Sequence, residues 1–190
     1  MKERGMIFNA EMVRAILDGR KTHTRRIVKG AAGAVKFCKE WDINGEEIFV
    51  VLGEKDHTGM NPVLGATSCP LGAVGDRIWV RETWNKYSGL LTYRADHDWI
   101  NEMRKETVCT AKWRPSIHMP RWASRILLEI TDVRVERLNT ISEEDAGREG
   151  YPADPAPYGG GMDKWLWFRQ LWDSIYPEQS FKHNPWVWVI

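Results

Sequence analysis

The 190-residue sequence has few cysteines and no long apolar run, and each shortage argues against a class of protein. Its three cysteines (Cys38, Cys69 and Cys109) are odd in number, lie far apart and form no C-x-x-C pair. A disulfide framework or a cysteine-rich zinc site is therefore not expected, and a reducing cytoplasm is the predicted location. No apolar run approaches the roughly 20 residues that a membrane span needs, and the first residues lack the apolar segment of a secretory signal. We expect no membrane partner.

Metal-ligating patterns are scarce as well. The five histidines form no H-x-H or H-x-x-x-H pair, so the sequence predicts neither a metal site nor a cofactor. A divalent metal held by carboxylates stays open if the protein is a nuclease, because such sites leave little trace in a sequence. The three consecutive glycines at 159–161 lack the lysine and the Ser/Thr of a phosphate loop, and we interpret them as a flexible lid or connector.

Charge is balanced overall but unevenly distributed. The formal net charge is +1, whereas the first 30 residues carry eight basic and three acidic side chains. This distribution predicts a local basic face rather than the global basicity of a protein that coats nucleic acid. A hydrophobic content of 43% and a length of 190 residues are typical of one globular domain with a substantial core.

The predicted elements mix short strands with a few helices. Helices are expected after the cap residue Asn9, ending at Gly19, after the capping-box residue Ser142, and at residues 164–176. Strands are expected at residues 6–8, 35–41, 46–52, 77–84, 90–95, 125–138 and 185–190. A change of parity near Thr131 predicts a bulge or bend in the strand at 125–138. Residues 53–75 and 152–162 have the composition of loops, and residues 96–122 give no clear pattern. The sum predicts an α+β domain built as a small, partly closed β-barrel with helices at its rim.

The densest chemistry lies in residues 19–26 (GRKTHTRR), directly after the first predicted helix. These eight residues include a lysine, two hydroxyls, an imidazole and three arginines. Such a cluster suits a site that holds an anion, moves a proton, or does both. In a chain with eleven tryptophans it points to a nucleotide or RNA ligand.

Four stretches, taken in order, resemble the ASCH domains of the PUA-like superfamily. They are residues 19–25 (GRKTHTR), 75–82 (GDRIWVRE), 138–149 (LNTISEEDAGRE) and 172–177 (WDSIYP) followed by a closing strand. The resemblance implies a single PUA-like β-barrel domain over residues 1–190, with insertions at 53–74 and 85–122. The longer form, with MPRWASR at 119–125, is similar to versions carried by phages and prophages.

The resemblance also implies an activity. PUA-like domains generally bind RNA or modified nucleosides, and no obligate protein partner is evident. The small ASCH proteins include amidohydrolases that remove the acetyl group from N4-acetylcytidine, using a lysine base, a threonine nucleophile three residues later and a glutamate proton donor. Matching motif to motif carries these roles onto Lys21, Thr24 and Glu149.

The chemistry of these residue types fits the roles. A threonine hydroxyl needs a base to take its proton. Lys21 can be that base only if burial or a neighbouring cation lowers its pKa. Because Lys21 and Thr24 would point to opposite faces of an extended strand, we expect them in a turn or an irregular segment.

Aromatic and basic residues interleave in the middle of the chain, which suits stacking of bases combined with attraction of phosphates. We expect at least one of its tryptophans to line the ligand cleft. The expected ligand-binding residues are Arg20, Arg25, Arg26, Trp79, Arg81, Glu82, Trp84 and Trp122. Arg81 and Glu82 could equally form a structural ion pair instead of facing the ligand. For His23, a passive surface role is slightly favoured over contact with a phosphate.

These inferences predict a nucleoside- or RNA-binding protein that hydrolyses an amide on a modified base. The cleft is expected between residues 21–26, residues 77–84 and the helix that carries Glu149. Two alternatives stay open: a ribonuclease in which Lys21 and the arginines stabilise a phosphorane, or a non-catalytic RNA-binding or regulatory module. The two insertions favour a ligand larger than a free nucleoside.

Overall fold

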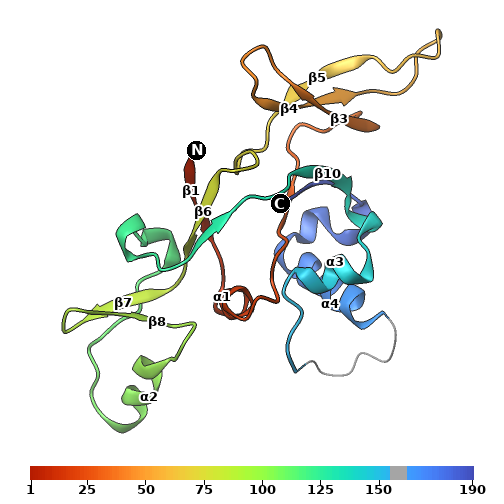
Figure 1. Cartoon of the computed structure of the whole chain (residues 1–190). Coiled ribbons are helices and arrows are strands. Elements are labelled where there is room, and N and C mark those ends of the chain that lie inside the picture. The colour runs from red at the N-terminus through yellow and green to blue at the C-terminus, as the bar shows by residue number, and fades with distance from the viewer. Residues whose placement is uncertain (155–161) are drawn as a thin grey trace.

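The computed structural model describes residues 1–154 and 162–190, so the connector expected at the three consecutive glycines lies outside the described residues. Helices and strands alternate irregularly along the chain (Figure 1). The strands are β1 (Glu3–Ile7), β2 (Arg25–Ile27), β3 (Lys36–Trp41), β4 (Glu47–Leu52), β5 (Val63–Thr67), β6 (Arg77–Arg81), β7 (Trp84–Tyr87), β8 (Leu90–Tyr93), β9 (Leu127–Glu129), β10 (Arg134–Arg137) and β11 (Trp186–Val189). The α-helices are α1 (Ala10–Leu17), α2 (Trp99–Glu106), α3 (Glu143–Arg148) and α4 (Asp163–Ile175). The α+β class is confirmed.

The described strands form three three-stranded sheets, ordered β1-β6-β9, β10-β11-β2 and β3-β4-β5, and the hairpin β7-β8. Strand β1 runs parallel to β6, and the other pairs are antiparallel. Within the residues that the structure describes, none of these sheets closes on itself. The β3-β4-β5 sheet projects from one end of the molecule, and the β7-β8 hairpin with α2 projects from the other (Figure 1).

Local capping signals place the helix ends. The Asn9 side chain accepts a hydrogen bond of 2.8 Å from the Met12 amide at the start of α1. Gly19 follows the helix with φ +72°, a conformation that glycine adopts without strain. At α3 the Ser142 hydroxyl accepts from the Asp145 amide at 3.0 Å. These three predictions are confirmed.

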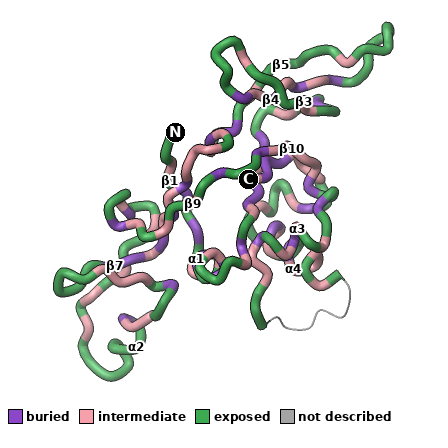
Figure 2. The backbone as a smooth tube through the Cα atoms, viewed as in Figure 1, coloured by how far each residue is buried: buried purple, intermediate pink, exposed green. Residues whose placement is uncertain are grey.

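Two hydrophobic cores flank the segment between α1 and β2. The first joins side chains of β1, α1, β6 and β11, and the second packs α3 and α4 against the other face of β11. The alternation in β11 explains the division, because Trp188 belongs to the first core whereas Val187 and Val189 belong to the second. Buried backbone is concentrated at the centre of the molecule, and the two projecting ends are mostly exposed (Figure 2).

Several strand predictions were wrong in extent. Residues 53–75 contain β5, whose mostly exposed side chains lack the alternation that marks a half-buried strand. The strand expected at 77–84 ends at Arg81, and Trp84 begins β7 in another sheet. The strand expected at 125–138 divides into β9 and β10, again in different sheets, with the break at the predicted bend near Thr131.

Among residues 1–154 and 162–190, no helix has both the length and the apolar character required to cross a bilayer.

Candidate active site

Residues 21–24 form an irregular segment between α1 and β2, as the spacing of Lys21 and Thr24 required. The amides of Thr22 and His23 both donate to the carbonyl of Arg148, at 2.8 and 3.0 Å. The backbone of Thr24 exchanges two hydrogen bonds with that of Ile190, at 2.9 and 3.1 Å. The segment is thereby fixed between the C-terminal end of α3 and the last strand.

The Lys21 ammonium is buried and fully engaged. Its side chain is only 2% exposed. Nζ donates to the carbonyl of His23 at 2.8 Å, to the carbonyl of Glu149 at 2.9 Å and to Oε2 of Glu149 at 2.9 Å. The same two residues also form an isolated antiparallel β-bridge. The lysine and the glutamate, 128 residues apart, therefore meet directly.

The Glu149 carboxylate lies between two cations. Its second oxygen, Oε1, accepts from Nη1 of Arg25 at 2.9 Å, and both side chains are almost completely buried. Arg25 also lies 3.5 Å from Asp145 and 3.7 Å from Glu136. Because both oxygens of Glu149 accept from cations, the carboxylate is held in one position.

Burial has a direct electrostatic consequence for the lysine. Desolvation lowers the pKa of Lys21 below its ordinary value, because the buried site disfavours the charged amine. The negative charge of Glu149 opposes this shift, whereas Arg26 and Arg25 reinforce it. A lowered pKa is what a lysine base requires, and burial is its main source.

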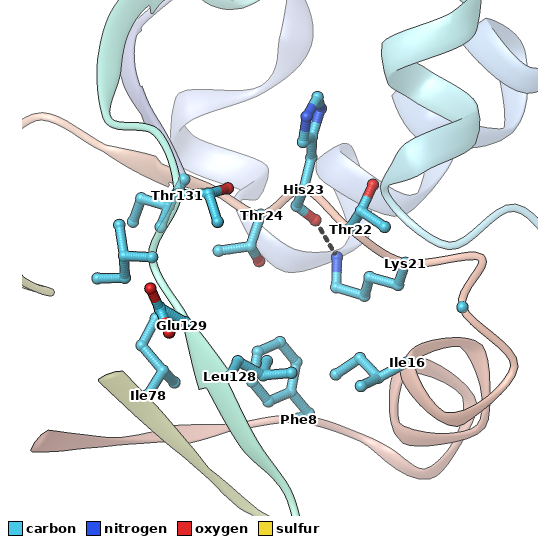
Figure 3. A pocket seen from close by; sticks show the side chains of 13 residues that line it. Phe8, Ile16, Lys21, Thr22, His23, Thr24, Ile78, Leu128, Glu129 and Thr131 are labelled. Carbon is cyan, nitrogen blue, oxygen red and sulfur yellow. Dashed lines mark hydrogen bonds between the residues drawn. The ribbon is translucent and has the colours of Figure 1, made fainter. Parts of the chain in front are cut away.

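A cavity of about 340 Å³ opens beside this segment. One side is formed by residues 21–24, and much of the rest by Phe8, which directly follows β1, and by apolar side chains from α1, β6 and β9. In Figure 3 the hydroxyl of Thr24 points to the same side of the segment as the Lys21 amine, whereas the Thr22 hydroxyl and the His23 ring point the other way. A second cavity of about 20 Å³, roughly the size of one water, is bordered by Lys21, Thr24 and Glu149 together. The three expected catalytic residues are therefore neighbours.

The three arginines of the cluster have separate positions. Arg25 is buried on Glu149, and Arg26 donates to the carbonyl of Arg25 at 2.8 Å. Arg20 turns away, donating to the carbonyl of Tyr151 at 2.6 Å and to Asp18 at 2.8 Å. None of the three borders the 340 Å³ cavity, although Arg25 and Arg26 border the small one.

The expected aromatic and basic ligand residues do not reach this cavity. Trp79 lies over Gly5, where an added Cβ would come within 2.6 Å of its ring, and Arg81 stacks on Trp79 at 5.3 Å. Trp84 is buried and contacts the exposed Trp122 edge to face at 5.6 Å. Of this part of the chain, Ile78 is the residue that borders the cavity.

Glu82 forms a structural ion pair, but with Arg125 rather than with the expected partner Arg81. Its carboxylate accepts from Arg125 at 2.9 and 3.1 Å. Arg81 instead donates to the backbone carbonyl of Ile117. The pair therefore links the end of β6 to the segment before β9, and neither of its residues borders the cavity beside Lys21.

Two cavity residues had no signal in the sequence. Glu129 is the last residue of β9 and Thr131 follows two residues later, and both border the cavity opposite Lys21 (Figure 3). In the sequence both alternate with apolar residues, the pattern of any half-exposed strand, so only the fold brings them to the site. His23 also borders the cavity, with its Nδ1 3.5 Å from Asp145, and burial lowers the pKa of its imidazole.

Within the described ranges, no group of three or more His, Cys, Asp or Glu side chains is arranged to hold a metal ion. Comparison of the chain with protein-family models, with curated proteins and with solved structures found no match.

Proposed function

We propose that this protein hydrolyses an amide on a modified base of the N4-acetylcytidine type, in the cavity beside Lys21. The observation that carries the proposal is the buried contact of 2.9 Å between Lys21 Nζ and Glu149 Oε2, next to the Thr24 hydroxyl. A base, a nucleophile and an acid that border one small cavity are the parts that acyl transfer requires.

The proposed scaffold is a PUA-like β-barrel of the ASCH type. Support comes from the first hydrophobic core, which joins side chains of the β1-β6-β9 sheet to Trp188 of the β10-β11-β2 sheet. Two sheets that share one interior are the arrangement from which a small, partly open barrel is built.

The reaction begins with Thr24. Its hydroxyl oxygen attacks the acetyl carbonyl carbon while the hydroxyl proton passes to a neutral Lys21 amine. The carbon–nitrogen bond of the amide then breaks, and the departing amino group of the nucleobase takes a proton. Water hydrolyses the resulting acetyl ester of Thr24, which releases acetate and restores the hydroxyl.

Glu149 supplies and receives the proton of Lys21. The direct hydrogen bond between the two side chains is the route by which the resting ammonium becomes a neutral base. Glu149 is absent from the wall of the 340 Å³ cavity, so its proton reaches the leaving group through Lys21. The hydrogen bond from Arg25 to the other oxygen keeps the Glu149 side chain in place beside Lys21.

The size of the cavity favours one nucleoside unit as the ligand. Ligand cavities commonly span about 300 to 1,000 Å³, and this cavity lies at the lower end of that range. Apolar side chains from Phe8, Ile16 and Leu128 form a floor on which a base can pack (Figure 3). An RNA substrate would have to insert a single unstacked base. We place this activity in the cytoplasm, in keeping with three free cysteines.

The first test is release of acetate from N4-acetylcytidine by the purified protein. Thr24→Val removes the proposed nucleophile at nearly constant volume and should abolish release. Thr22→Val is the matched control, because the Thr22 hydroxyl points away from the Lys21 amine (Figure 3). Shortening of labelled RNA without acetate release, or full activity in Thr24→Val, would contradict the proposal.

The pH dependence of the reaction follows from the burial of Lys21. A neutral amine is the active form, so kcat/KM should rise with pH as Lys21 loses its proton. Because burial lowers the pKa of Lys21, the midpoint of this rise should lie below 10.5, the ordinary value for lysine. The profile is measured as initial rates of acetate release, and the rising limb belongs to the coupled Lys21–Glu149 pair. A rate that falls as pH increases over this range would overturn the assignment of Lys21 as base.

A further inference from the structure

A second surface with the features of a ligand site lies around Trp122, on the β7 side of the molecule. We call it the Trp122 surface and define it by Trp84, Lys86, Arg114 and Trp122. None of these residues borders the cavity beside Lys21. In Figure 1 strand β7 and helix α3 lie on opposite sides of α1, so this surface is separate from the proposed reaction site.

The four side chains form a continuous series of ring and cation contacts. Trp84 is only 1% exposed and is packed with Met119 and Ala123 in a small core of its own. Trp122 meets Trp84 edge to face at 5.6 Å, yet it remains 63% exposed. A large exposed indole on a buried support presents a ring at low entropic cost, because binding does not have to order it.

Cations lie against both rings. Lys86 Nζ is 5.7 Å from the centre of the Trp122 ring, and the Arg114 guanidinium is 4.9 Å from that of Trp84. In the described part of the chain, neither cation forms an ion pair with an acidic side chain. Their charge is therefore available to a partner.

Basic side chains outnumber acidic ones in the sequence around this surface, although residues 96–106 contribute Asp96, Asp98, Glu102 and Glu106. Segments 83–95 and 107–128 contain no Asp or Glu, and their basic residues are Lys86, Arg94, Lys112, Arg114, Arg121 and Arg125. Three of these cations are paired with acids from elsewhere in the chain: Arg94 with Asp98, Arg121 with Glu3, and Arg125 with Glu82 and Asp96. A net positive charge remains on the surface, and a partner must be anionic.

We propose that the Trp122 surface binds a single-stranded polynucleotide, with a base stacked on Trp122 and phosphates at Lys86 and Arg114. An exposed aromatic ring flanked by unpaired cations matches the alternation of flat bases and charged phosphates along such a strand. A duplex hides the faces of its bases, so it cannot use the ring. An acidic peptide would use the cations without the stacking.

The experiment measures the affinity of the full chain for fluorescein-labelled oligouridylate and oligodeoxyuridylate, which differ only in the 2′-hydroxyl, by anisotropy at two salt concentrations. Trp122→Ala should weaken binding about tenfold, and Trp122→Phe should retain most of it. Lys86→Ala should weaken binding and reduce the slope of log affinity against log salt by about 1. If one oligonucleotide binds much better than the other, the 2′-hydroxyl contributes and the natural ligand is assigned accordingly.

Two matched controls lie on β3, at the far end of the molecule. Trp41 is 68% exposed, so Trp41→Ala removes an equally accessible indole, and Lys36→Ala removes an exposed lysine. Both variants should bind as the unmodified chain does. The proposal would be overturned if neither oligonucleotide binds, or if Trp41→Ala and Trp122→Ala lose the same amount of affinity. It would also be overturned if polyglutamate displaces the oligonucleotide from Trp122→Ala as strongly as from the unmodified chain. Binding is measured without turnover, so a chain that binds the oligonucleotide and releases no acetate refutes the proposed reaction and leaves this surface standing.

Discussion

Replacing Lys21 by methionine is expected to reduce kcat/KM for N4-acetylcytidine by about a thousandfold, the middle of the range that general base catalysis contributes. Methionine fills similar volume but cannot take the Thr24 proton. It also breaks the route that links Glu149 to the cavity. The measurement is the initial rate of acetate release over a range of pH, and the rising limb should disappear together with the rate.

The same change is expected to affect folding, and the two effects must be separated. It removes the donor shared by the His23 carbonyl, the Glu149 carbonyl and the Glu149 carboxylate. Breaking a buried ion pair costs about 3 kcal/mol of unfolding free energy. Denaturant unfolding of Lys21→Met therefore accompanies the kinetics. Lys29→Met, at an exposed position after β2, should change neither measurement, and a folded Lys21→Met that keeps its activity would exclude Lys21 as the base.

Arg125→Ala is expected to give the largest loss of stability outside the proposed site. Glu82 is 1% exposed, and without Arg125 its carboxylate would be buried with no cation beside it. Burial alone would lower the pKa of Arg125, but hydrogen bonds to Glu82 and Asp96 raise it above the usual value, so the guanidinium remains charged. Removing one partner of such a pair should lower the unfolding free energy by about 3 kcal/mol.

Arg121→Ala provides the comparison. Arg121 also pairs with a glutamate at 2.8 Å, but both side chains of that pair are substantially exposed to water. Exposed pairs of this kind contribute about 0 to 1 kcal/mol. Urea unfolding of the two variants tests whether burial, rather than the number of ion pairs, determines the effect. Equal losses would mean that the Glu82 site is more hydrated than its geometry indicates.

Local signals in the sequence were sufficient to place both ends of α1 and the start of α3. Asn9, Gly19 and Ser142 act on backbone groups within three or four residues, so their effect does not depend on the rest of the fold. The contact between Lys21 and Glu149, in contrast, could not be predicted from a local signal. It joins residues 128 positions apart, and the sequence indicated it only through a resemblance of motifs.

The partners of strands and aromatic rings could not be predicted in the same way. Trp79 and Trp84 are close in the sequence and equally surrounded by basic residues. The chain turns between β6 and β7, however, so Trp79 packs on Gly5 while Trp84 supports Trp122. Likewise β5 is held mainly by backbone pairing with β4, which leaves no pattern in its side chains. Tertiary contacts decide these cases, and they are not encoded in any short window of sequence.

The end of α3 has a consequence for motion. The carbonyl of Arg148, its last residue, accepts from the amides of Thr22 and His23, and the carbonyl of the cap residue Glu149 accepts from the Lys21 side chain. If this helix end frays, three donors in residues 21–23 lose their hydrogen-bond acceptors at the same time. The helix end and that stretch behave as one cooperative opening unit, and neither can loosen without the other.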